Sequence, residues 1–153
     1  MIKPEGWTIS DEAFAVHGIH QDACEKVGVP IKTALSMLRW MMRPARRYVA
    51  HSADFDLDRI EAEIHRQGIV WDLDRRSAFC TKEAMTPVCK IPHTNGRHWT
   101  GQEFKWPSLQ EAHTHCFGSE FDGAHNAIAD VQACKRVFLW MREKNLVNND
   151  LTE

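Results

Sequence analysis

The chain of 153 residues lacks the features that mark several special classes of protein. No apolar run approaches the ~18 residues that a membrane-spanning helix needs. Residues 1–6 have no apolar core of the kind that secretory signals carry. The five cysteines are odd in number, widely scattered and without a Cys-x-x-Cys pair, which favours a reducing compartment over a disulfide framework. We therefore expect a cytoplasmic protein that has no membrane segment.

A large charge of one sign is also lacking, because the formal net charge is only −2. The chain as a whole is therefore not an electrostatic trap for nucleic acid, and any such binding has to be local or helped by metal ions. Hydrophobic residues make up 43% of the chain and charged residues 26%, which are ordinary values for a soluble globular protein. With no internal repeat or low-complexity tract in the sequence, we expect a single domain over residues 1–153.

Apolar periodicity and turn residues predict a mixture of helices and short strands. We expect helices near residues 11–17, 21–27, 30–43, 57–67, 108–115 and 126–144, and strands at 48–51, 69–71 and 79–81. Prolines and glycines predict one long irregular loop over residues 86–107. The buried face of the last helix is expected to consist of Ala127, Val131, Cys134, Phe138 and Met141. Strands that alternate with helices indicate an α/β layer fold.

Residues 124–130, Ala-His-Asn-Ala-Ile-Ala-Asp, are the most informative stretch, because they place an imidazole and a carboxylate near one helix start. If both His125 and Asp130 were helical, their side chains would diverge by about 140°. They converge only if His125 lies just outside the helix and Asn126 is near the N-cap position. Such a pair could deprotonate a water and hold a divalent metal ion. A capping Asn, a first-turn acid and a surface histidine explain the spacing equally simply, and spacing alone favours that interpretation.

A second stretch, residues 49–56, places Asp56 where a short strand turns into a helix. Functional sites of α/β sheets tend to lie at strand ends, which makes Asp56 a candidate for chemistry. Taken alone, Asp56 is better explained as a helix cap. His51, inside the strand, is more often a hydrogen-bonded core histidine than a ligand.

Together the two stretches resemble the second and third motifs of the DEDDh (DnaQ-like) 3′–5′ exonucleases, which have an RNase H-like fold. Those motifs typically read His-Asn-x-x-Phe-Asp and His-x-Ala-x-x-Asp. Ser52 stands here where Asn is usual, whereas the third motif is complete. Residues 105–109 and 117–118 are also similar to phage and bacterial members, so that the resemblance covers nearly the whole chain.

The resemblance implies a metal-dependent enzyme that hydrolyses terminal phosphodiester bonds of DNA, with RNA as a second candidate substrate. It assigns catalysis to His125, Asp130 and Asp56, with His125 as the general base. Asp56 and Asp130 would hold Mg²⁺ or Mn²⁺. A single-stranded 3′ end is the expected ligand, and a DNA polymerase is a candidate partner. The residues implied to contact substrate are His17, Gly18, Ile19, His51 and Phe55.

The family's first motif, Asp-x-Glu on an opening strand, has no counterpart before Lys3. Residues 2–4 look like the end of a strand, so we expect an RNase H-like fold that lacks the first strands of its sheet. The chain would then lack two of the four carboxylates that hold the family's two metal ions, and the metal site would be incomplete. Two alternatives remain open: an inactive nucleic-acid-binding or polymerase-associated module, and a fragment that does not fold stably alone.

Basic and aromatic residues are interspersed through the predicted loop and the stretch before it. They are Lys82, Lys90, Arg97, His98, Trp99, Lys105 and Trp106. Such interspersion is compatible with binding of single-stranded nucleic acid. Packing of the tryptophans in the core is the alternative that the residues themselves favour.

Overall fold

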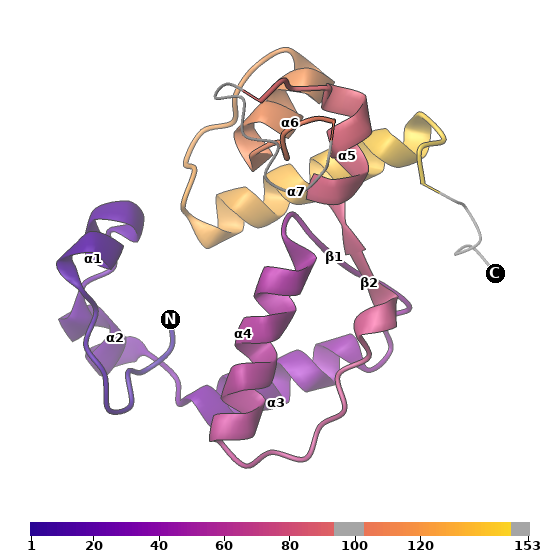
Figure 1. Ribbon diagram of the computed structural model, residues 1–153. Helices are drawn as coiled ribbons and strands as arrows, with labels where there is room; N and C mark the ends of the chain where they lie inside the picture. The colour runs from indigo at the N-terminus through magenta and orange to yellow at the C-terminus, as the bar shows by residue number, and fades with distance from the viewer. Residues whose placement is uncertain (94–102, 148–153) are drawn as a thin grey trace. The chain divides into compact units, whose positions relative to one another are not determined.

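Helices make up most of the chain in the computed structural model, which describes residues 1–93 and 103–147 (Figure 1). The elements in chain order are α1 (Asp11–His17), α2 (Gln21–Val27), α3 (Ile31–Met42), β1 (Tyr48–Ala50), α4 (Ala53–Arg66), a 3-10 helix (Arg75–Ser77), β2 (Ala78–Cys80), α5 (Thr81–Cys89), α6 (Leu109–Phe117) and α7 (Ala127–Glu143). Strands and helices alternate in part, as the predicted α/β class requires. Over the described ranges, no helix combines the length and apolar character that a membrane crossing demands.

The chain divides into two compact units. The N-terminal unit consists of Met1–Ala45 and Leu57–Asp74, and the C-terminal unit consists of Arg46–Asp56 and Arg75–Glu153. The division falls within α4, whose first turn belongs to the C-terminal unit. The single domain expected over residues 1–153 stays a prediction.

Local signals set the helices of the N-terminal unit. The Ser10 hydroxyl accepts the Ala13 N–H at 3.2 Å and begins α1, which ends at Gly18 in the left-handed conformation with φ of 66°. Helix α2 ends before Gly28, and α3 follows Pro30 directly. The predicted starts and ends of these three helices are confirmed to within one or two residues.

Gly28 allows a close backbone approach in the same unit. Ile2 and Val29 form an isolated parallel bridge, in which the Lys3 N–H donates to the Val29 carbonyl at 2.8 Å. A Cβ at position 28 would lie 2.8 Å from the Lys3 nitrogen and 2.9 Å from the Ile2 carbonyl carbon. Any side chain there would push the first residues away. The strand end expected at residues 2–4 is present as this single bridge.

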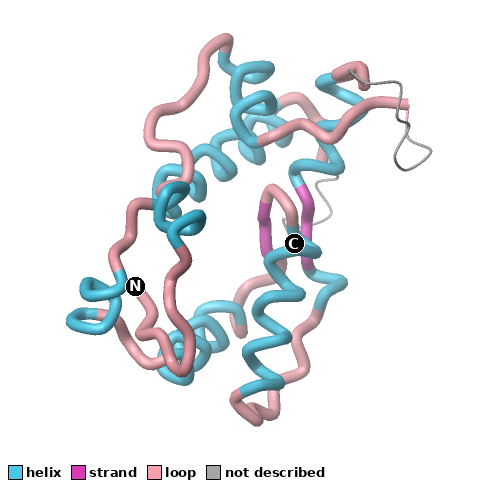
Figure 2. The backbone as a smooth tube through the Cα atoms, turned by 60° about the vertical axis from the view of Figure 1, so that its left-hand side comes forward, coloured by secondary structure: helices cyan, strands magenta, loops and turns pink. Residues whose placement is uncertain are grey.

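The C-terminal unit is built around a two-stranded parallel sheet. Tyr48 lies opposite Ala78 and Ala50 opposite Cys80, so that both strands finish at the same edge (Figure 2). Helix α4 begins three residues after β1 ends, and α5 follows β2 without a break. The strands predicted at residues 48–51 and 79–81 are confirmed to within one residue. The parallel register therefore places two helix starts at one edge of the sheet.

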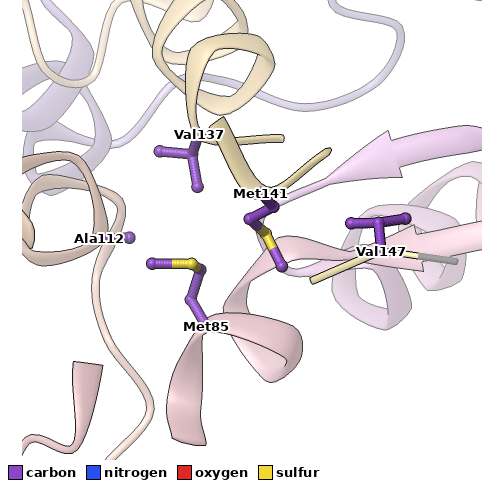
Figure 3. Close-up of a cluster of buried hydrophobic side chains, with 5 residues drawn as sticks. All are labelled: Met85, Ala112, Val137, Met141 and Val147. Carbon is purple, nitrogen blue, oxygen red and sulfur yellow. The ribbon is translucent and has the colours of Figure 1, made fainter. Parts of the chain in front are cut away.

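The core of the C-terminal unit lies where α5, α6 and α7 pack together. Met85 of α5, Ala112 of α6, and Val137 and Met141 of α7 are completely buried, and Val147 closes the cluster (Figure 3). The strands join this core through Phe79, whose ring meets Phe138 edge-on at 5.3 Å. The face predicted for α7 is partly wrong, because Val131 is 68% exposed and Ala127 is also exposed. The first turns of α7 line a pocket instead of packing on α5 and α6.

Two further predictions need correction. Residues 69–71 form no strand: the Ile69 N–H bonds back to the Ile64 carbonyl at the end of α4, and Val70 is 90% exposed. The loop expected over residues 86–107 begins only after Cys89, because α5 continues through Pro87. Proline removes one helical donor, but burial of Met85 and Thr86 outweighs that loss near the helix end.

The ends of the remaining irregular segment are joined by a hydrogen bond at 2.8 Å from the Lys105 N–H to the Ile91 carbonyl. The basic and aromatic residues Arg97, His98 and Trp99 fall outside the described residues. Lys82, by contrast, belongs to the first turn of α5, and Trp106 lies just before α6. The structure therefore describes only the two ends of this predicted basic and aromatic stretch.

Candidate active site

The start of α7 has the geometry that convergence of His125 and Asp130 requires. Asn126 is the N-cap, and its side-chain oxygen accepts the N–H groups of Ile128 and Ala129 at 3.0 and 3.4 Å. His125 lies outside the helix with φ of 70°, a left-handed conformation that histidine adopts more readily than most residues. Asp130, in the first turn, accepts the His125 backbone N–H at 3.3 Å. This contact joins the Asp130 carboxylate to the His125 backbone, not to its imidazole.

The end of β1 supplies the second part of the site. His51 and Ser52 form the turn between β1 and α4, and the Asp56 N–H donates to the Ser52 carbonyl at 3.1 Å. Asp56 therefore projects from the first turn of α4. Burial raises the pKa of the Asp56 carboxyl, and the nearby Lys82 ammonium opposes that shift. Asp56 thus occupies a partly desolvated position in which a nearby cation would stabilise its charged carboxylate.

Both ring nitrogens of His51 are engaged within the protein. Nε2 lies 3.0 Å from the Pro107 carbonyl and Nδ1 lies 3.0 Å from the Thr81 hydroxyl. A carbonyl can only accept, so Nε2 carries the proton. The Thr81 hydroxyl has one proton, for which Nδ1 and the Ala50 carbonyl, at 3.2 Å, compete. Burial is the main reason that the pKa of His51 is lowered, and the neutral ring is the form that this bonding fits. His51 therefore joins the end of β1 to the residues preceding α6.

One pocket of about 880 Å³ contains the ends of both stretches, and all its lining residues belong to the C-terminal unit. Its polar lining comprises His51, Ser52, Asp56, Ser108, Gln110, His125, Asp130 and Lys135. Much of the remaining lining is apolar and includes Val49, Leu109, Phe121, Val131 and Phe138. Gln110 secures the wall by donating to the Phe121 carbonyl at 2.8 Å and accepting its N–H at 3.0 Å. The residues from two distant motifs thus share one partly apolar pocket.

Two carboxylates, Asp56 and Asp130, are available in this pocket for a metal ion. Within residues 1–93 and 103–147, no three side chains of His, Cys, Asp or Glu are grouped to hold a metal together. Proteins commonly bind Mg²⁺ through one or two carboxylates, with water and substrate phosphate oxygens completing the shell. By donor type the two carboxylates match such a shell, and they are too few for a two-metal centre.

A comparison with protein families identifies the kind of protein to which this pocket belongs. The RNase_T family model, described as an exonuclease, matches residues 1–138. The chain belongs to the RNase_T exonuclease family. None of the curated proteins matches it. Membership of this DEDDh, DnaQ-like family implies an RNase H-like fold and makes the protein a hydrolase by family.

The substrate contacts predicted for this RNase_T member are not all on the pocket wall. His51 is, although both of its ring nitrogens are occupied. Phe55 is 56% exposed and is not part of the lining. His17 and Ile19 line a separate pocket of about 520 Å³ in the N-terminal unit, where His17 Nδ1 accepts the Ile19 N–H at 3.0 Å. Gly18 ends α1 between them, and its role in substrate binding stays a prediction.

Three polar residues at the site of this RNase_T member were not predicted as part of it. Lys135 and Gln110 line the pocket, and Lys82 donates to Ser52 at 2.8 Å. Lys82 and Ser52 are 30 residues apart in sequence, so no local spacing could predict their contact. Lys135 follows Asp130 by five positions, about 140° round α7, so helical spacing from the first-turn acid does not predict it on the pocket wall. The charge of the site is therefore less negative than its two carboxylates suggest.

Proposed function

We propose that this protein is a metal-dependent 3′–5′ exonuclease that removes nucleotides from single-stranded DNA, with RNA as a second substrate. The observation that carries the proposal is the presence of Asp56, His125 and Asp130 on one pocket wall. These residues come from stretches about seventy positions apart that resemble two ordered motifs of the family. The pocket volume of about 880 Å³ is also large enough for a nucleotide-sized ligand.

The proposed reaction is attack of a water oxygen on the terminal phosphodiester. The bond from phosphorus to the 3′-oxygen of the preceding nucleotide breaks, and a nucleoside monophosphate leaves. His125 would accept the water proton, because it lies just outside α7 and lines the pocket. Asp56 and Asp130 would hold Mg²⁺ or Mn²⁺. When bound, the ion supplies positive charge that stabilises the phosphate oxygens during attack.

The direct test measures release of mononucleotides from a 3′-labelled single strand with Mg²⁺, with Mn²⁺, and with chelator. Asp130→Asn is the matched control, because it keeps the side-chain shape and an oxygen that can accept the His125 N–H. We expect metal-dependent release that falls by at least about 10²-fold in the variant. Equal rates for both proteins would overturn the site assignment. No release by the wild type would overturn the enzymatic proposal.

A second candidate is a module that binds single-stranded nucleic acid without cutting it. It is favoured by one observation: the described residues provide two carboxylates in the pocket and no group of three metal-holding side chains. In the assay above, this candidate predicts undegraded oligonucleotide with or without metal. It also predicts unchanged binding of the strand when Asp130 is replaced by Asn. Binding that needs Mg²⁺ and Asp130 would speak against it.

A further inference from the structure

Trp106 is an aromatic side chain at the pocket edge that the proposed chemistry does not use. The expectation from sequence favours packing of such tryptophans in the core, yet 40% of Trp106 is exposed. Trp106 immediately precedes Pro107, whose carbonyl accepts from His51. The following residues, Ser108 and Leu109, lie on the pocket wall. The exposed ring is therefore tied to the proposed active site through the backbone that forms one of its edges.

Lys82 holds this ring in place from the other side. Its ammonium lies 4.3 Å from the centre of the Trp106 ring and donates to the Ser52 hydroxyl at 2.8 Å. Ser52 itself lines the pocket. One cation thus covers a face of the indole and contacts the pocket wall, an arrangement that fixes the orientation of a large aromatic surface. Lys82 occupies one face of the ring and 40% of Trp106 remains exposed, so a stacking base would use the face away from Lys82.

The combination of an open aromatic face and a partly buried cation has a specific chemical fit. Nucleobases stack on exposed aromatic side chains irrespective of their identity, and basic groups follow the phosphates of the same strand. A purely structural tryptophan would need neither the exposure nor the adjacent ammonium. An apolar protein partner would not use the charge of Lys82. Single-stranded nucleic acid uses both features at once.

We propose that Trp106 and Lys82 form a nucleotide-binding subsite at the edge of the pocket. A base of the single strand stacks on the open face of Trp106, and a neighbouring phosphate lies beside the Lys82 ammonium. The nucleotide in this subsite is unstacked from a neighbour on one side, because stacking on an indole requires a base face that no neighbouring base covers. The subsite rests on the proposed function for the identity of its ligand, whereas its test measures binding alone.

The experiment titrates the full chain against a labelled ten-nucleotide single strand in chelator, with fluorescence anisotropy as the readout. Trp106→Ala should weaken binding on the order of 10-fold, whereas Trp106→Phe, which keeps an aromatic face, should remain within about threefold of wild type. Trp40→Ala is the matched control, since Trp40 is 77% exposed and belongs to the N-terminal unit. It should bind as wild type does. Lys82→Met should reduce the salt dependence of log Kd by about 0.7.

Strands with one abasic position, moved stepwise from the 3′ end, test stacking directly. At one position, removing the base should weaken binding to the wild-type protein. The same abasic strand should bind Trp106→Ala as tightly as the intact strand does. The proposal is overturned if Trp106→Ala binds all strands as wild type does. It is also overturned if the loss of affinity of Trp106→Ala relative to wild type is the same for every abasic strand. Loss of binding in Trp40→Ala equal to that in Trp106→Ala would overturn it as well. A protein that stacks through Trp106 but releases no nucleotides refutes only the exonuclease proposal, and the reverse result refutes only the subsite.

Discussion

The imidazole of His51 is kept neutral by its surroundings in the folded protein. Burial lowers its pKa, and the Pro107 carbonyl and Thr81 hydroxyl are placed to bond the neutral ring. Burial also raises the pKa of the Cys134 thiol, which lies 3.7 Å from the Thr81 oxygen and so keeps a proton to donate. The chain of contacts from α7 to the segment before α6 therefore depends on an uncharged His51.

This arrangement predicts a loss of stability in mild acid. A histidine whose folded pKa is lowered contributes stability that is present above its unfolded pKa of about 6.5. That contribution is lost as the pH falls through the lower, folded value. We expect the melting temperature to fall between pH 7.5 and pH 5 in wild type, and to fall less in His51→Gln. His65→Gln, at an exposed position on α4, should retain the wild-type slope. Parallel slopes for all three proteins would contradict the prediction.

His125 combines a chemical role with an unusual backbone conformation. Its φ of 70° costs energy for most side chains, and Ala at this position would add strain to any catalytic loss. His125→Asn separates the two, because Asn tolerates the left-handed conformation and has no basic nitrogen. We expect a decrease in nucleotide release of about 10²–10⁴-fold with little change in melting temperature. Full activity in His125→Asn would remove this residue from the role of base.

At the scale of the element, the cap of α7 positions both members of the third motif. Asn126 satisfies two first-turn N–H groups and thereby fixes the start of α7. His125 directly precedes this cap, and Asp130 lies in the first turn. Removing the cap should therefore affect stability and the site together.

Asn126→Ala should cost about 1 kcal/mol in the free energy of unfolding, measured by urea denaturation. Asn126→Asp retains the capping oxygen and should stay close to wild type. A cost in the Ala variant equal to that in the Asp variant would show that the amide oxygen does not carry the cap. Activity should fall in Asn126→Ala by more than its stability loss explains, because the relation of His125 to Asp130 is no longer fixed.

The helix ends were predictable because their signals lie in consecutive residues. Ser10, Gly18 and Asn126 act within one turn of their own positions, and the structure confirms all three. Burial depends instead on elements far away in sequence. Val131 is exposed and Val137 is buried because α5 and α6 cover only the later turns of α7. The apolar residues 69–71 have strand character but no neighbouring strand, since the Ile69 N–H bonds to the end of α4.

The same distinction applies to the candidate site. Asp56, His125 and Asp130 come from two stretches that resemble ordered motifs, and all three line one pocket, while their catalytic roles stay a prediction. The contact of Lys82 with Ser52 and Trp106 depends on how β1, α5 and the segment before α6 come together. No local pattern contains that information.

For the molecule as a whole, the C-terminal unit owes its stability to a small set of buried side chains. Met141 is completely buried and contributes to the cluster shared by α5, α6 and α7. Met141→Ala should lower the free energy of unfolding by about 2–5 kcal/mol, because it removes buried methylene groups and leaves a cavity. Trp40→Ala, at an exposed position, should change it by less than about 0.5 kcal/mol. Chemical denaturation of both variants measures the difference.

The parallel register of β1 and β2 and the position of α7 bring helix N-termini to the pocket. Asp56 lies in the first turn of α4, and Ala127 and Asp130 lie in the first turn of α7, all on the pocket wall. Each N-terminus carries a partial positive charge of about half a unit from its aligned peptide dipoles. Together these dipoles offset about half of the charge of the two carboxylates before any cation arrives. A phosphate therefore meets less repulsion in the pocket than the two carboxylates alone would cause.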